Sequence, residues 1–193
     1  MRIGYVVEGF RDAAFLEGLR ARWCPKAEML EGGSRGSTGL AIGRESANLC
    51  AELRFRRVDF VVILRDANRE DWRDVLKRES EMVPGDVRQV TLYGVADRNI
   101  ECWLCADLDF AASQLGIDSE QLRSAEDPKR VLDEALGGRQ SGEQDSKIAA
   151  LVQAAPLRNW IGASRSFERF YEDARDLAQR SGQCQIPNER ARG

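Results

Sequence analysis

Three acidic residues stand where a metal-binding or catalytic group would be expected. Glu8 follows a short apolar run and precedes Gly9, Asp66 follows the most apolar segment of the chain, and Glu101 follows a further apolar run. Ligands of an open parallel sheet bind beyond the carboxyl ends of its strands. Carboxylates gathered there repel one another, and a divalent cation such as Mg²⁺, which prefers oxygen ligands, relieves that repulsion. Asp66 also has a second interpretation, as the N-cap of the next helix.

The absence of histidine narrows the chemistry further. With no histidine among 193 residues, the chain has no Ser-His-Asp or Cys-His pair, no histidine zinc site and no imidazole-dependent nuclease centre. Catalysis would have to use carboxylates, other polar side chains or a metal held by oxygen atoms. Without histidine, Glu8, Asp66 and Glu101 are the main candidates for a catalytic or metal-binding role.

Hydrophobic patterning predicts an α/β fold with a mostly parallel sheet flanked by helices, followed by a helical C-terminal extension. We expect strands at Ile3 to Glu8, Ala27 to Glu31, Val58 to Leu64 and Val87 to Val95. We expect helices at Phe10 to Trp23, Leu40 to Phe55, Trp72 to Met82, Ile100 to Leu108, Asp127 to Leu136, Ser146 to Ala154 and Phe167 to Arg180. The expected divisions are an α/β core over residues 1–110, a helical portion packed on it over 111–180, and a polar tail over 181–193.

Composition and charge indicate a protein of the cytoplasm. No apolar run is long enough to span a membrane, and the N-terminus has no signal-peptide pattern. The net charge is −3, and four of the 29 basic residues are lysines, leaving 25 arginines. A biased coding sequence explains this excess, and recognition of phosphate or carboxylate by arginine is the functional alternative.

The five cysteines are an odd set for a secreted disulfide scaffold and fit a reducing compartment. Cys102 and Cys105 have the C-x-x-C spacing, but no second pair completes a zinc site. We interpret both as small core residues, and we expect Trp103 between them to pack in the core. The segment from Gly32 to Gly39 lacks the lysine of a phosphate-binding P-loop.

The order of these motifs resembles a bacterial family of TOPRIM-like proteins of unknown function. This family is distantly similar to the TOPRIM nuclease domain of overcoming-lysogenization-defect proteins. Its pattern is E-G near the start, D-x-D in mid-chain, and then E-x-W-L-x-A-D. The chain has Glu8-Gly9, then Asp66-Ala67-Asn68, then the segment from Glu101 to Asp107. Further along, Asp127 to Lys129, Lys147 and the segment Ser164 to Phe167 match the family's later motifs.

The resemblance implies a TOPRIM fold with metal-dependent phosphodiester chemistry, as in a nuclease or phosphodiester-transfer effector. It implies Mg²⁺ or Mn²⁺ held by Glu8, Asp66, Asn68 and Glu101, with Glu8, Asp66 and Lys147 as catalytic residues. Lys147 as a solvated helix residue is the alternative. Nucleic acid is the implied substrate, and an ATPase protein is an implied partner in an anti-phage defence system. The oligomeric state is left open.

The sequence departs from the family pattern at one metal-ligand position. Asn68 stands where the family has the second acid of D-x-D. An amide oxygen can bind a metal but brings no charge, and the cation Arg65 precedes the first acid. A catalytically weakened binding or regulatory subunit with the same fold is therefore the alternative function. A small-molecule or nucleotide binder in the same crevice is a third.

Overall fold

The computed structural model describes residues 1–32, 48–125, 128–136 and 142–189. It has a four-stranded sheet in which all neighbouring strands are parallel, in the order β2-β1-β3-β4. The strands are β1 (Arg2–Val7), β2 (Glu28–Glu31), β3 (Phe60–Asp66) and β4 (Thr91–Ala96). The predicted fold class is confirmed. The chain order reverses between β1 and β3, which is the place where open α/β sheets form their ligand crevice.

Helices connect the strands, and further helices come after the last strand in the chain. They are α1 (Phe10–Trp23), a helix at 48–55, α3 (Trp72–Met82), α4 (Gly85–Arg88), α5 (Ile100–Leu104), α6 (Leu108–Leu115), α7 (Ser119–Ser124), α8 (Pro128–Ala135), α9 (Gly142–Ala154), α10 (Leu157–Ala163) and α11 (Arg165–Ser181). The bounds predicted for α1 and α3 match. The strand predicted from Val87 to Val95 is present as β4, but it begins only at Thr91, because the short helix α4, with Pro84 as its N-cap, precedes it. The prediction from Leu40 falls partly outside the described residues.

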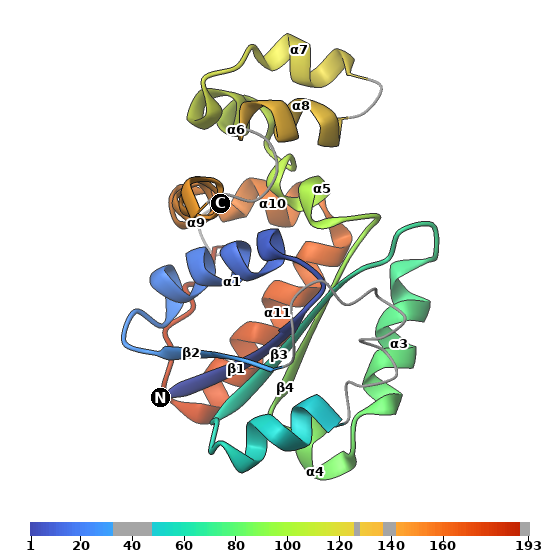
Figure 1. Cartoon of the computed structure of the whole chain (residues 1–193), viewed down its shortest axis with the longest axis vertical. Coiled ribbons are helices and arrows are strands. Elements are labelled where there is room, and N and C mark those ends of the chain that lie inside the picture. Colours follow the sequence, from blue (N-terminus) through green and yellow to red (C-terminus); the bar gives the residue numbers. More distant parts are fainter. Residues whose placement is uncertain (33–47, 126–127, 137–141, 190–193) are drawn as a thin grey trace.

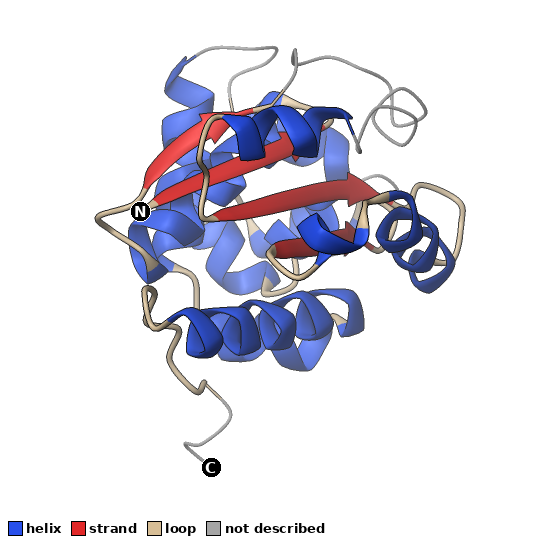
Figure 2. Cartoon of the chain, turned by 90° about the horizontal axis from the view of Figure 1, so that it is seen from below, coloured by secondary structure: helices blue, strands red, loops and turns tan. Residues whose placement is uncertain are grey.

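Helices cover both faces of the sheet (Figures 1 and 2). Alternate strand residues such as Tyr5 and Val62 pack with α1, α9, α10 and α11 in the larger core. The intervening residues, such as Val61 and Ile63, pack against the helix at 48–55 and the segment around α4. Strand residues alternate between the two faces, and both faces here are apolar. This explains the continuous apolar run that marks β3 in the sequence.

An aromatic cluster joins the C-terminal helices to the sheet. Trp103 is fully buried and packs with Phe15, Phe167 and Phe170 at ring-centroid distances of 5.3–5.5 Å. Its Nε1 donates a hydrogen bond to Ser166 Oγ at 2.8 Å. The prediction that Trp103 is a core residue is confirmed. Through this cluster α5 is fixed against α11, which holds Glu101, two residues before Trp103, near the sheet edge.

The helices after residue 104 form two groups. Helices α6, α7 and α8 stand at the end of the molecule away from most of the sheet (Figure 1) and share a small core that includes Leu122 and Leu132. Helices α9, α10 and α11 contribute instead to the larger core.

Helices α1 and α9 cross closely at Gly18. A Cβ on Gly18 would lie 2.6 Å from the carbonyl oxygen of Ala149. The absence of a side chain at Gly18 therefore allows this close approach.

The cysteines differ from the prediction. Cys24 and Cys184 form a disulfide with a Cα–Cα distance of 5.0 Å. It ties the tail to the end of α1, next to a hydrogen bond from Gln185 N to Trp23 O. Cys102 is exposed, so its interpretation as a core residue is wrong; it lies on the outer side of α5, whereas Trp103 faces inward. Within the described ranges, each helix is too short or too polar to cross a membrane.

Candidate functional site

The carboxyl ends of β1 and β3 open into a polar cleft of about 380 Å³. Glu8 directly follows β1, and Asp66 is the last residue of β3. Val7 lies opposite Leu64 in the parallel register, so the two acids leave neighbouring strands at the same edge. The cleft is lined by Glu8, Gly9, Phe10, Arg11, Asp12, Asp66, Ile100, Glu101, Lys129 and Gln144.

The first turn of α1 contributes a buried acid that sequence analysis missed. Asp12 is 5% exposed, and its Oδ2 accepts a hydrogen bond from Gly9 N at 2.8 Å. This is the half of a capping box in which the third helical residue reaches back to the cap. Burial, and next the charge of Asp66, raise the pKa of Asp12 well above its usual value. The E-G-x-x-D spacing is the signal that would have identified it.

Asp66 interacts with the charges of several other residues in the cleft. Its Oδ1 accepts a hydrogen bond from Ile100 N, at the start of α5, at 2.9 Å. The alternative interpretation of Asp66 as the N-cap of the next helix is wrong, because Asp71 caps α3. Asp66 instead accepts from the first residue of α5, 34 positions later in the chain. Burial first, and then the charges of Glu8 and Glu101, raise the pKa of Asp66 to about 7. Asp66 can change its protonation state near neutral pH.

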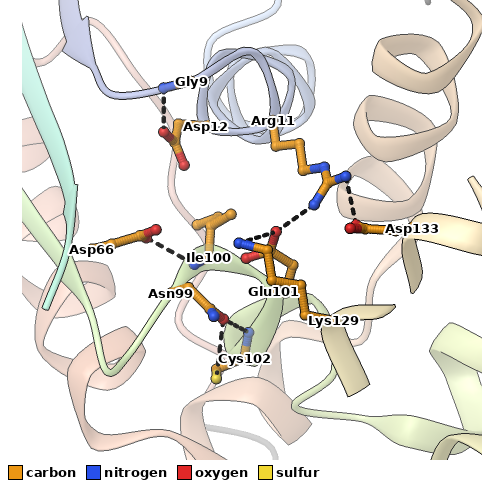
Figure 3. A network of polar contacts seen from close by, with 10 residues as sticks. All are labelled: Gly9, Arg11, Asp12, Asp66, Asn99, Ile100, Glu101, Cys102, Lys129 and Asp133. Atoms are coloured by element: carbon orange, nitrogen blue, oxygen red, sulfur yellow. Dashed lines mark hydrogen bonds and ion pairs between the residues drawn. The ribbon is translucent and has the colours of Figure 1, made fainter. Parts of the chain in front are cut away.

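Glu101 is held by cations from two helices (Figure 3). Its Oε1 lies 2.5 Å from Arg11 Nη1 and 3.4 Å from Lys129 Nζ of α8. Arg11 also pairs with Asp133 of α8 at 2.5 Å. Glu101 itself is 4% exposed, and its Oε2 is buried without a hydrogen-bond partner. A buried carboxylate oxygen without a partner is costly, and this one belongs to a residue that lines the cleft.

Glu8 is engaged by a buried arginine. Arg65 Nε lies 3.2 Å from Glu8 Oε1, and Arg65 Nη1 forms an ion pair with Glu79 of α3. Arg65 is 7% exposed and Glu79 1%. Arg65, the cation that precedes Asp66 in the sequence, therefore places its positive charge next to Glu8. In the structure as it stands, Glu8 is an ion-pair partner of Arg65 and not an unoccupied ligand.

Two residues implied by the resemblance lie outside the cleft lining. Asn68 is exposed and has a left-handed φ of 56°, and its Nδ2 lies 3.4 Å from the backbone oxygen of Asp66. Lys147 is exposed on α9 and pairs with Glu143 at 3.0 Å. The cations that line the cleft are Arg11 and Lys129. Lys129 belongs to the D-P-K motif, but only the packing of α8 against α5 identifies it as a cleft residue.

The arrangement of acids differs from a closed metal site. Among the described residues, no group of three or more acidic or cysteine side chains is arranged to hold a metal ion. The predicted set of Glu8, Asp66, Asn68 and Glu101 is divided: three members line the cleft and Asn68 does not. Figure 3 shows Asp12, Asp66 and Glu101, from three different elements, turned toward one region, with Arg11 and Lys129 reaching Glu101.

Comparison with protein-family models, with curated proteins and with solved structures gives no match to this chain. The resemblance to TOPRIM-like proteins accordingly remains a prediction from the motifs.

Proposed function

We propose that the protein is a Mg²⁺-dependent enzyme that cleaves phosphodiester bonds, a nuclease, with the cleft between β1 and β3 as its active site. The observation that carries the proposal is Glu101, a buried carboxylate lining the cleft with one oxygen that no hydrogen bond satisfies. Beside it, the pKa of Asp66 is raised by burial and by neighbouring carboxylates. A bound cation would give the free oxygen of Glu101 a partner and would relieve the repulsion among the carboxylates around Asp66.

The residues fit Mg²⁺ as a site with two carboxylates. Mg²⁺ keeps several waters and commonly binds one or two protein carboxylates together with a substrate phosphate. Asp66 and Glu101, through its Oε2, would hold the ion, since both line the cleft. When bound, Mg²⁺ would polarise a phosphoryl oxygen and make a coordinated water more acidic.

The other cleft residues have roles that follow from their charge. Arg11 and Lys129 would bind the phosphodiester, because they are the cations in the cleft lining and guanidinium and ammonium groups stabilise developing phosphate charge. Burial and the neighbouring carboxylates raise the pKa of Asp12, which favours its protonated form. Since its Oδ2 accepts from Gly9 N, Oδ1 is the atom that would carry the proton toward a leaving oxygen.

The test combines metal binding with cleavage. Mg²⁺ should raise the melting temperature of the wild type, and Glu101→Gln should remove that shift while exposed Glu120→Gln keeps it. Cleavage of single-stranded and double-stranded DNA and RNA should be lost in Glu101→Gln. It should fall about 100-fold or more in Lys129→Ala, the scale of losing one electrostatic contact to the transition state.

Lys147→Ala provides the matched comparison, because Lys147 is a lysine that lies outside the cleft lining. Loss of cleavage in Lys147→Ala with full activity in Lys129→Ala would overturn the assignment of the phosphate-binding cations. An equal Mg²⁺ response in the wild type and Glu101→Gln would overturn the metal site.

The alternative function is a binding or regulatory subunit without catalysis. The observation that favours it is that Arg65 already neutralises Glu8, while Arg11 and Lys129 share Glu101. This alternative predicts no cleavage by the wild type with either Mg²⁺ or Mn²⁺. An ATPase partner and a role in anti-phage defence remain predictions from the motifs.

A further inference from the structure

The end of the helix at 48–55 presents an exposed aromatic ring among arginines. Phe55 is 89% exposed, and in the described part of the chain Met82, at 42%, is the other large apolar residue that is exposed. Arg54, Arg56 and Arg57, its neighbours in sequence, are exposed as well. We call residues 54–57 the Arg-Phe patch. Single exposed apolar residues are ordinary, but this one lies within a run of three cations.

The backbone at Arg57 is that of a helix end where glycine is preferred. Arg57 has a left-handed φ of 58°. Its N–H donates to Arg54 O at 2.9 Å, and Val58 N donates to Leu53 O at 3.3 Å. This is the hydrogen-bond pattern of a Schellman cap, in which glycine usually occupies the left-handed position. An arginine here accepts an unfavourable conformation, so a benefit to folding does not explain its presence.

The charges of the patch are only partly neutralised. Arg56 bonds to Glu31 O at 2.8 Å and lies 3.9 Å from Glu52, a weak and exposed pair. Arg54 donates to the backbone oxygen of Val58 at 3.2 Å. No side-chain hydrogen bond or ion pair joins Arg57 to another described residue. Arginine, which forms bidentate bonds with phosphate and stacks on flat groups, is suited to a ligand that offers both.

We propose that the Arg-Phe patch is a docking site for single-stranded nucleic acid, in which a base stacks on Phe55 and phosphates bind the arginines. A positively charged surface with an exposed aromatic ring is the arrangement that single strands use, because unpaired bases offer a free face. An acidic protein would satisfy the arginines but leave the ring without a flat partner. Charge complementarity and the free aromatic face together favour the nucleic acid.

The patch is separate from the cleft. The helix at 48–55 leads into the start of β3, at the end of the sheet opposite α5 (Figure 1), whereas Asp66 is at the end of β3. The start and the end of the seven-residue strand β3 are six steps apart, roughly 20 Å at about 3.3 Å per residue. The patch would anchor a strand at a distance from the cleft, and its function does not depend on whether the cleft cleaves.

Binding is therefore measured without metal. A fluorescently labelled 20-nucleotide oligothymidylate is titrated with the full chain in EDTA at low salt, and fluorescence anisotropy is recorded. Phe55→Ala should weaken binding about 5- to 150-fold, the range for removing one base stack. Arg57→Gly should also weaken binding and should reduce the slope of log K against log salt by about 0.7, the effect of one lost phosphate contact on a single strand.

Arg57→Gly is informative because it separates binding from folding. Glycine suits the left-handed position, so the melting temperature should stay equal or rise while the affinity falls. Met82→Ala and Arg180→Gln, which alter an exposed apolar residue and an exposed arginine elsewhere, should bind as the wild type does.

Three outcomes would overturn the proposal. They are no binding by the wild type at low salt, unchanged affinity in Phe55→Ala, and equal affinity for a duplex of the same length. Binding of polyglutamate in preference to the oligonucleotide would assign the patch to an acidic protein instead. Oligonucleotide binding by a wild type that cleaves no nucleic acid with Mg²⁺ or Mn²⁺ would refute the proposed nuclease and leave the docking site standing.

Discussion

Replacing Asp66 with asparagine tests the electrostatics of the cleft most directly. The change removes the charge but keeps an oxygen that can accept the hydrogen bond from Ile100 N. The pKa of Asp66 is about 7 in the folded protein, against 3.8 as the usual value. A carboxyl group whose pKa is raised by folding favours the unfolded state once that state ionises. Ionised Asp66 therefore destabilises the metal-free protein.

The size and pH window follow from linkage. Below pH 3.8 the carboxyl is protonated in both states and contributes nothing. Between pH 3.8 and about 7 only the unfolded state loses its proton, so stability falls, and above about 7 the full loss is present. Roughly three pKa units at about 1.4 kcal/mol each amount to at most about 4 kcal/mol. For a chain of this size, this corresponds to at most about 8–16 °C in melting temperature.

The assay is thermal unfolding followed by circular dichroism in EDTA at pH 4.5 and pH 8.5. Asp66→Asn should melt well above the wild type at pH 8.5, and most of this difference should disappear at pH 4.5. Exposed Asp86→Asn controls for the general loss of a negative charge and should follow the wild type at both values. A melting temperature of Asp66→Asn that stays parallel to the wild type across this range would refute the reasoning.

Two further predictions concern the framework around the site. Cys24 and Cys184, which form the disulfide, are 160 residues apart. Reducing this bond should lower the free energy of unfolding by roughly 5 kcal/mol by the chain-entropy relation, or the melting temperature by about 10–20 °C. Thermal melts with and without dithiothreitol, and of Cys24→Ser, measure this, and an unchanged melting temperature would contradict it. Gly18→Ala should destabilise by about 1–3 kcal/mol, because the new methyl group would meet the backbone oxygen of Ala149. Gly162→Ala in α10, where nothing lies within 4 Å of the new methyl, should be neutral or should stabilise by up to about 1 kcal/mol in urea unfolding. Equal effects at the two glycines would show that the crossing of α1 and α9 is not close-packed.

Predictions from local pattern succeeded where a single segment carries the information. The apolar run of β3 indicated a strand buried on both faces, and the cores on its two sides explain why. The alternation of strands and helices predicted a parallel sheet, and its geometry alone brings Glu8 and Asp66 to one edge. Helices α6, α7 and α10 were missed because each has only six to eight residues, too few for a repeating apolar pattern to stand out in the sequence. The N-caps Asp107 and Asp118 were the available signals.

The sequence by itself determined the fold class and the core position of Trp103. It also determined that Glu8, Asp66 and Glu101 lie at the end of a strand or shortly after one. These features depend on the pattern of apolar residues along a single segment. Only the tertiary structure decided that Arg11 and Lys129 reach Glu101, that Arg65 holds Glu8, and that Lys147 and Asn68 lie outside the cleft lining. It also decided the pairing of Cys24 with Cys184. These contacts depend on how α8, α9 and the tail pack on elements that are distant in the sequence. The spacing of residues within one helix does not determine which side chains of another helix its charged residues contact.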